Sequence, residues 1–256
     1  MLIINADDFG RTKGITDDIV TCFREHRITS TSAMVFMQDS HRAARLSLEH
    51  NLEVGLHLNF DERFDGDVPT TRCSEYQNRV ATFLTSTKYC QVLFNPLLGK
   101  EFRYLYDVQY EAFLRLYQRP PSHINGHHHM HLSTNVLAGR IIPDGTRVRR
   151  SFTFARGERA FPNRLYRRVV DRVVERHFIT TDMLFAAGPS EQPNELKRKV
   201  ACATHRNVEL IVHLSSREDV DYLRTRDFVD AVGDARLGTY RDLPATRLSS
   251  DIAAYV

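Results

Sequence analysis

Five histidines stand within nine residues of the chain, in the stretch HINGHHHMH from residue 123 to residue 131. Imidazole binds transition metals and transfers protons near neutral pH, and turn chemistry alone does not explain such a density of histidine. The tract therefore indicates a metal site or a catalytic site. Not all five side chains can be ligands of one ion, so we expect His123, His128, His129 and His131 to orient ligands, to pack, or to face a substrate.

Other residues of the same chemical kind stand where predicted strands end. Asp7 and Asp8 follow the apolar run LIINA, His57 lies near the end of LEVGLHL, His127 follows HING, and His213 ends VELIVH. Chemistry in parallel α/β folds collects at the carboxyl ends of strands. Adjacent aspartates point to opposite sides of an extended chain, so we expect Asp7 and Asp8 to have different roles.

Two imidazoles and one carboxylate can hold a divalent cation and leave coordination positions open for water and substrate. Such an ion lowers the pKa of bound water and polarises a carbonyl group. A remaining carboxylate can accept the proton of the water, and a further histidine can return a proton to the leaving group. The set suits metal-assisted hydrolysis of an amide or ester. Taken singly, the aspartates could instead cap a helix, and His57 or His213 could be a core histidine.

The elements that must position these residues alternate along the chain. Short apolar runs predict strands at 2–6, 29–36, 52–60, 122–126, 147–150, 180–185 and 208–214. Helical patterns cover 16–26, 40–50, 101–117, 163–176, a segment beginning near 193, and 221–232. Thr16 is the expected N-cap of the first of these helices. The segment 61–75 is interpreted as a polar loop. The alternation predicts one α/β domain over residues 1–256 with six or seven strands, either a (β/α) barrel or a doubly wound sheet.

Composition narrows the classes of function. The 256 residues are 42% hydrophobic and 26% charged, and no apolar run approaches the ~20 residues of a membrane span. The N-terminus resembles no secretory leader and the four cysteines are scattered, which predicts a cytoplasmic protein with structural thiols. A net charge of +3 is too mild to predict nucleic-acid binding. A homodimer is an open option.

Six motifs in order carry a resemblance that spans residues 3 to about 243: NADDFG, TSTSAMV, GLHLN, HHHMH, a late strand ending in histidine, and LGTYRDL. The series resembles the YdjC-like carbohydrate deacetylases, the family of chitooligosaccharide deacetylase. The resemblance implies a deformed TIM-like (β/α) barrel with about seven parallel strands. It also implies removal of an N-acetyl group from an amino sugar, with one divalent metal ion as cofactor and an N-acetylated sugar as partner.

The resemblance also assigns roles to individual residues. Asp8, His57 and His127 fall on the metal ligands of the family, Asp7 on its general base and His213 on its general acid. Zinc is the expected ion, with magnesium, cobalt and nickel as alternatives.

The chain departs from the family pattern at two positions. Asn125 stands where the family has an acidic residue, two before the metal-binding histidine, and Leu214 stands where it has a proline. Asn125 can form hydrogen bonds but supplies no charge to a histidine, and the missing proline is expected to free the loop after His213. Four other residues could contact substrate or brace the barrel, with bracing favoured: Arg149, Arg150, Tyr240 and Arg241.

Two alternatives to a deacetylase stay open. A non-haem iron oxygenase uses the same kind of ligand set, although such enzymes commonly take an H-x-D pair from an all-β fold and residue 59 here is asparagine. A sugar-binding protein that has lost turnover would be consistent with Asn125 and Leu214. Iron-dependent oxygen consumption would support the first alternative, and tight sugar binding without acetate release would support the second.

Overall fold

The structure, a computed structural model, describes residues 1–154, 161–233 and 235–244. Within these ranges six strands form one parallel sheet in the order β4-β3-β2-β1-β6-β5. The strands are β1 (Leu2–Phe9), β2 (Ser30–Ala33), β3 (Val54–Leu58), β4 (Ile124–Gly126), β5 (Met183–Ala186) and β6 (Val208–Val212). Strands adjacent in sequence are neighbours in the sheet, except β4 and β5, which form its two edges, and β6 returns to pair with β1. This is the cyclic order of a barrel that is open between β4 and β5.

The sheet has six strands where the sequence led us to expect about seven. The segment predicted as a strand at 147–150 forms only isolated bridges, Ile124 with Val148 and Arg147 with Ile179. These contacts, and a hydrogen bond from Thr153 N to the Leu184 carbonyl at 2.9 Å, continue from β4 toward β5. Too few backbone groups pair for a ladder, so the sheet is curled rather than fully closed.

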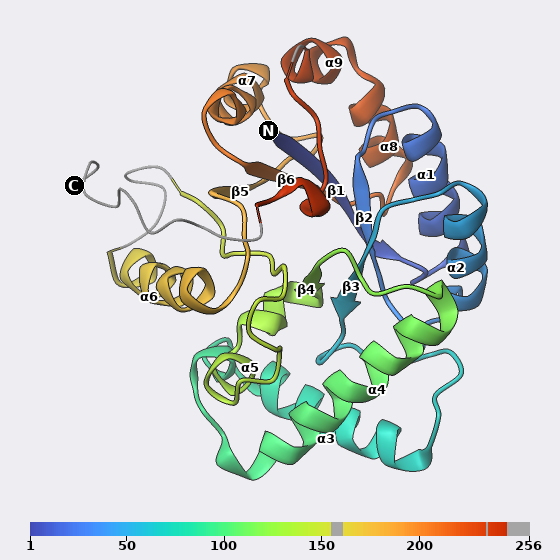
Figure 1. Cartoon of the computed structure of the whole chain (residues 1–256), viewed down its shortest axis with the longest axis vertical. Coiled ribbons are helices and arrows are strands. Elements are labelled where there is room, and N and C mark those ends of the chain that lie inside the picture. The colour runs from blue at the N-terminus through green and yellow to red at the C-terminus, as the bar shows by residue number, and fades with distance from the viewer. Residues whose placement is uncertain (155–160, 234, 245–256) are drawn as a thin grey trace.

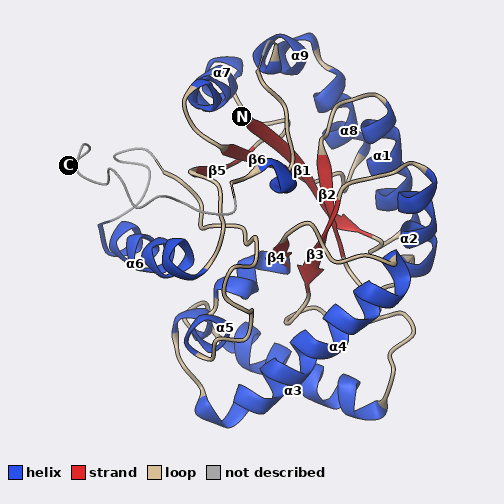
Figure 2. Cartoon of the chain, in the orientation of Figure 1, coloured by secondary structure: helices blue, strands red, loops and turns tan. Residues whose placement is uncertain are grey.

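Helices surround the curled sheet on its outer side (Figures 1 and 2). They are α1 (Lys13–Arg24), α2 (Ser40–Glu49), α3 (Thr71–Ser86), α4 (Gly99–Tyr117), α5 (Thr134–Ala138), α6 (Phe161–His177), α7 (Pro193–Ala201), α8 (Arg217–Arg224) and α9 (Arg226–Val232). Short 3-10 turns include η3 (His127–Leu132) and η5 (Tyr240–Asp242). None of the helices in these ranges is long and apolar enough to cross a membrane.

Several predicted boundaries were wrong. The first helix begins at Lys13, and its cap is Thr12, whose hydroxyl accepts a hydrogen bond from Ile15 N; Thr16 is the predicted cap and lies inside the first turn. Because Ile15 is already buried, the apolar face of this helix starts earlier than the predicted cap allows. The predicted loop at 61–75 overlaps the start of α3, and the last predicted helix is divided at Thr225 into α8 and α9.

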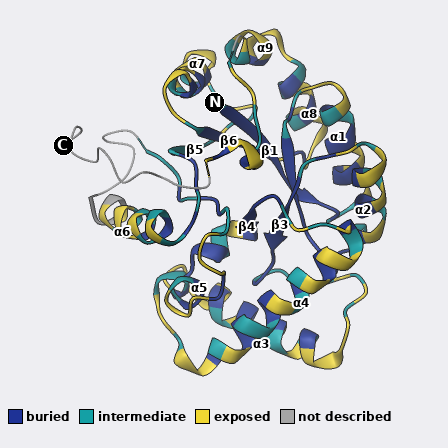
Figure 3. Ribbon diagram, in the orientation of Figure 1, coloured by how far each residue is buried: buried dark blue, intermediate teal, exposed yellow. Residues whose placement is uncertain are grey.

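Five of the six strands are buried on both faces, whereas β5, at the edge of the sheet, is partly exposed (Figure 3). Apolar side chains such as Leu2, Ile4 and Ala6 pack outward against the helices in the main core. Inside the curl the alternate residues Asn5 and Asp7 of β1 are polar, as are residues of the neighbouring strands, and they are joined by hydrogen bonds. The interior of the curled sheet is therefore a hydrogen-bonded polar column that ends at the carboxyl ends of the strands.

Candidate functional site

The end of β1 brings two carboxylates to the same rim. Asp8 has a backbone φ of +69°, a left-handed conformation that aspartate tolerates better than most residues. The pairing of β1 with β2 shifts register between Ala6 and Phe9. Because the chain is not regularly extended here, the alternation assumed for an extended strand does not apply to Asp7 and Asp8, but the two carboxylates do have different partners. Both carboxylates, 3% exposed, contact groups of the polar interior.

Asp8, His57 and His127 form a buried cluster in which one ligand atom from each residue lies within 4.8 Å of the others. Asp8 Oδ1 is 3.2 Å from His57 Nε2 and 3.0 Å from His127 Nδ1. His57 comes from β3 and His127 begins η3 directly after β4, so three strand ends supply the cluster. Among the described residues this is the only such group of three or more metal-binding side chains.

The cluster fits a divalent cation by its donor set. One carboxylate oxygen and two imidazole nitrogens suit zinc and other first-row divalent metals. Burial lowers the pKa of His57, but the negative charges of Asp7 and Asp8 outweigh it, so the pKa lies above its usual value. The site therefore favours a positive charge between Asp8 and the imidazoles, which a proton or a metal ion can supply.

The orientation of the Asn125 amide determines which nitrogen of a neutral His57 carries the proton. With the amide oxygen toward the ring, Oδ1 accepts from Nδ1 at 2.8 Å, and the amide nitrogen donates to Ser32 Oγ at 3.0 Å. With oxygen and nitrogen exchanged, the nitrogen donates to Nδ1 at 2.8 Å and the oxygen accepts from Arg149 at 2.8 and 3.0 Å. The exchanged arrangement suits the metal-free site. A metal on Nε2 requires the first, because Nε2 must then be free of its proton.

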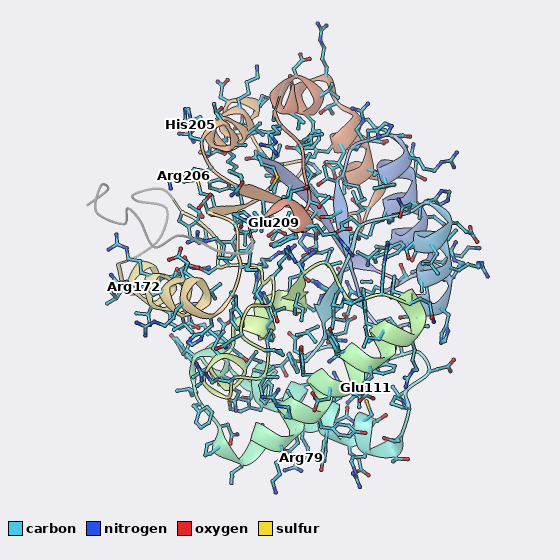
Figure 4. The ribbon with its side chains drawn as sticks, viewed as in Figure 1. Arg79, Glu111, Arg172, His205, Arg206 and Glu209 are labelled. Atoms are coloured by element: carbon cyan, nitrogen blue, oxygen red, sulfur yellow. The ribbon has the colours of Figure 1, made fainter. Side chains whose placement is uncertain are left out.

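Asp7 is held by a buried arginine. Arg149 donates to Asp7 Oδ2 at 2.6 Å and Oδ1 at 2.8 Å, and on its other side it donates to Glu209 Oε1 at 2.9 and 2.6 Å. Tyr240 donates its hydroxyl proton to Glu209. Figure 4 shows Glu209 in the middle of the molecule, whereas Arg79 and Arg172 lie at its edge.

These contacts set the ionisation of both acids. Burial raises the pKa of Asp7, but the Arg149 guanidinium outweighs burial and holds that pKa well below its usual value. Burial also raises the pKa of Glu209, and there it prevails over the opposing effect of Arg149. Arg149 therefore favours the ionised form of Asp7 more strongly than that of Glu209, and Asp7 is the acid nearer the rim.

His213 lies at the open side of Asp7. Its Nε2 is 3.9 Å from Asp7 Oδ2, and its side chain is 54% exposed. The loop that follows was expected to be free without a proline, yet it is held by the capping box of α8, in which Ser215 N and Ser216 N donate to Asp219 Oδ2 at 3.2 and 2.9 Å. A histidine at this place can meet solvent and the Asp7 carboxylate together.

The other histidines of the tract contact the rim without joining the cluster. His123 stacks on Tyr240 with 4.0 Å between ring centroids, and His131 Nε2 is 3.1 Å from the Arg149 carbonyl. His128 pairs with Asp61, and His129 packs on Phe152. Burial lowers the pKa of His131 to about 3. These side chains brace the site as neutral groups where they are buried.

Of the four residues expected to brace or to contact substrate, all have structural partners. Arg149 and Tyr240 lie inside the curl, Arg150 is 3.0 Å from Asp171, and Arg241 is 2.8 Å from Glu53. Five polar residues of the site were not predicted from the sequence, and each is buried in the column or contacts a predicted ligand: Asn5, Arg11, Ser32, Glu62 and Glu209.

A cavity of about 490 Å³ opens beside the cluster. Arg11 and Glu62 line it and also contact Asp8 and His127, and Leu214, the neighbour of His213, lines it as well. A larger cavity of about 600 Å³ lies between α6, β5 and α7. None of the five predicted site residues lines either cavity, but the smaller one borders them through Arg11, Glu62 and Leu214.

Fold and site together define an α/β protein with a curled parallel sheet and a buried cluster of one carboxylate and two imidazoles at the carboxyl ends of its strands. Comparison with known protein families identifies one family. The family model described as YdjC-like protein matches residues 1–241, and the chain belongs to that family.

Curated relatives match about half of the chain. A chitooligosaccharide deacetylase of Proteus mirabilis (strain HI4320) is 35% identical over 138 residues, which cover 54% of this chain and 52% of the relative. A chitooligosaccharide deacetylase of Yersinia pestis (strain Pestoides F) is 32% identical over 139 residues, with 53% and 52% covered. The match thus spans about half the length of these curated relatives.

One solved structure shares the fold over nearly its whole length. It is a protein of Enterococcus faecalis V583 provisionally named for cellobiose-phosphate cleavage, with a TM-score of 0.69 and 18% sequence identity. The similarity covers 93% of this chain and 97% of that chain. At this identity the likeness establishes the fold alone.

Proposed function

We propose that the protein is a metal-dependent deacetylase that removes an N-acetyl group from an amino sugar or a similar acetamide. The observation that carries the proposal is the buried cluster of Asp8, His57 and His127 with a second carboxylate, Asp7, beside it. Family membership and the names of the curated relatives support the same reaction.

Asp8, His57 and His127 would hold the ion, with zinc expected and magnesium, cobalt or nickel as alternatives. When bound, a divalent ion supplies polarisation of the amide carbonyl and a lowered pKa for a bound water. The polar cavity lined by Arg11 and Glu62 offers hydrogen-bonding groups to a sugar next to the cluster.

Asp7 would act as the general base. Its carboxylate is ionised at neutral pH, and Arg149 fixes the orientation of its plane through two hydrogen bonds. His213 would act as the general acid, because its imidazole stands at the open side of Asp7 and is half exposed. A proton taken from water by Asp7 and a proton given to the departing amine by His213 balance the hydrolysis.

The test is acetate release from N-acetylglucosamine oligomers by metal-stripped protein before and after addition of zinc, cobalt, nickel or magnesium. We expect release that depends on the metal, is lost in Asp7→Asn with the metal still bound, and is lost in Asp8→Asn and His57→Ala together with the metal. Full metal occupancy in both ligand variants would contradict the assignment of ligands.

Two results would favour the alternatives. Tight binding of the oligomers without acetate release under any metal would support a sugar-binding protein. Oxygen consumption that requires ferrous iron would support an oxygenase.

A further inference from the structure

Glu62 is a carboxylate beside a predicted metal ligand to which no role has yet been given. It follows β3, and its backbone is fixed on both sides, because Glu62 N donates to Asn59 Oδ1 at 2.9 Å and Gln77 donates to the Glu62 carbonyl. Its side chain is 28% exposed and reaches toward His127. The position of this carboxylate is therefore set by the loop and not by chance contact.

The side chain of Glu62 has two different partners. Its Oε1 accepts from Arg11 Nε and a terminal Arg11 nitrogen at 3.2 and 2.8 Å. Its Oε2 is 3.0 Å from His127 Nε2, within ion-pair distance but outside hydrogen-bond geometry in this structure. Both atoms, Glu62 Oε2 and His127 Nε2, are buried and have no hydrogen-bond partner among the described residues. Each is thus the available partner of the other.

His127 needs such a partner if it binds a metal. Its Nδ1 faces Asp8 Oδ1 at 3.0 Å, so the opposite nitrogen, Nε2, must carry the proton when Nδ1 is a ligand. A buried N–H without an acceptor is costly, and a carboxylate acceptor fixes the tautomer and raises the basicity of the ligand.

Arg11 links this carboxylate to the other side of the cluster. One of its terminal nitrogens is 3.4 Å from Asp8 Oδ2, while Asp8 Oδ1 faces both imidazoles. Arg11 thereby occupies the second oxygen of Asp8 and leaves one oxygen for the ion. Glu62 itself lies outside the group of three whose ligand atoms are all within 4.8 Å.

We propose that Glu62 and Arg11 are positioning residues for the metal ligands: Glu62 orients His127 through Nε2, and Arg11 holds Glu62 in place and keeps Asp8 bound through one oxygen. The proposal rests on the cation site of the proposed function. It adds a link between the β1–α1 loop and the β3–α3 loop that the ligand motifs do not contain.

The experiment measures affinity for zinc and cobalt alone, by competition with a chromophoric chelator, on the metal-stripped full chain without sugar. Glu62→Ala should weaken binding roughly 10–100-fold at an unchanged stoichiometry of about one ion. Glu62→Gln keeps an acceptor for Nε2–H but loses the charge, so its affinity should fall between those of the wild type and Glu62→Ala. Asp67→Asn, the same loss of charge on a 96% exposed side chain of the same loop, should bind like the wild type.

A double-mutant cycle tests the link itself. Arg11→Gln should weaken binding, and its effect should be smaller in the Glu62→Ala background, because the part transmitted through Glu62 is already lost. The visible bands of the cobalt-loaded protein should shift in Glu62→Ala, since the imidazole is no longer held in one orientation. Circular dichroism shows whether each variant is folded, and Glu62→Gln retains the test if Glu62→Ala is not.

Three outcomes would overturn the proposal. The first is a Glu62→Ala variant that binds the metal with wild-type affinity. The second is a double variant in which the fold-changes in affinity caused by Arg11→Gln and Glu62→Ala multiply independently. The third is complete loss of the ion in Glu62→Gln, which would make Glu62 a ligand. Asp8→Asn distinguishes the proposed cation site from the proposed positioning role. If Asp8→Asn also binds the metal like the wild type, the cation site itself is wrong. If Asp8→Asn loses the ion and the Glu62 and Arg11 variants do not, the cation site is correct and the positioning role is wrong.

Discussion

Replacing Arg149 with methionine should be one of the most destabilising substitutions in the polar column. Arg149 is 0% exposed, and it donates four hydrogen bonds to two buried carboxylates. Methionine fills a similar volume but leaves Asp7 and Glu209 without a countercharge. Removing one partner of a buried ion pair costs about 3–5 kcal/mol, so Arg149→Met should lose at least about that much stability at pH 7.

The loss should depend on pH in a defined direction. Without the guanidinium, burial is opposed only by weaker effects, those of His57 and His213 on Asp7 and of Tyr240 on Glu209, so we expect the pKa of both acids to rise above the unfolded values. The folded variant then binds protons that the unfolded chain does not, so it gains stability relative to the wild type as pH falls. In the wild type the opposite holds for Asp7, whose lowered pKa contributes stability above its unfolded pKa and loses it as pH falls. The difference between the two proteins should therefore shrink from pH 7 to pH 5.

The assay is urea unfolding of metal-stripped protein at both pH values, with Arg150→Met as the matched control. Arg150 is the next residue, but its carboxylate partners Asp171 and Glu175 are partly exposed, so its loss should cost less and should vary little between pH 5 and pH 7. Adding Asp7→Asn to Arg149→Met should recover stability, because it removes one unpaired buried charge. A deficit below about 1 kcal/mol, or one equal at both pH values, would refute this account of the column.

Three further predictions follow from individual contacts. Gly55→Ala places a methyl group against the His123 ring and should cost about 1–3 kcal/mol, seen as a lower melting temperature. Because burial lowers the pKa of His131 to about 3, the folded protein resists protonating it, and the free energy of unfolding should fall as pH drops below ~6.5. In urea titrations between pH 6.5 and 5, His131→Asn should reduce this pH dependence by up to about 1.4 kcal/mol per pH unit. Asn125→Asp adds a carboxylate where the Asn125 amide is 3.4 Å from Asp7, and it should move the acidic limb of the pH–rate profile for acetate release to higher pH.

The sequence predicted the site better than it predicted the elements. Asp7, Asp8, His57, His127 and His213 were selected because each stands at the end of an apolar run, and the structure brings them together at one rim. The rule works because parallel strands share a direction, so their carboxyl ends meet whatever the lengths of the helices between them. Their roles as ligands, base and acid stay predictions until the metal and activity assays are done.

The boundaries were harder to predict because their signals are weak in this chain. The buried face of α3 consists of Cys73, Gln77, Val80, Ala81 and Leu84, only two of which are strongly apolar. Such a face does not stand out from a polar loop. The segment at 147–150 has a strand-like sequence, but its pairing is limited by tertiary position rather than by composition.

The polar column is visible in the sequence as polar residues spaced two apart, a pattern that predicting strands from apolar runs does not use. Asn5 and Asp7 alternate in β1, as do Ser30 and Ser32 in β2, and Asn125 precedes His127 at the same spacing. Residues two apart face the same side of a strand, so polar pairs at this spacing in several strands indicate a polar interior. Glu209 has no polar residue two positions away within β6, and Arg149 becomes its partner only through the fold.

Asn125 shows why a departure from the family pattern need not remove the metal site. An aspartate at this position could only accept hydrogen bonds, and its charge would add a third carboxylate to a space where Arg149 already serves Asp7 and Glu209. The amide is neutral, accepts from His57 Nδ1 in one orientation and donates to it in the other. Asparagine can therefore support the metal-bound tautomer of His57, but in that orientation its amide nitrogen faces the terminal nitrogens of Arg149 at 2.8 and 3.0 Å, donor against donor. An aspartate would accept from both His57 and Arg149, and it would compete with Asp7 for the same guanidinium.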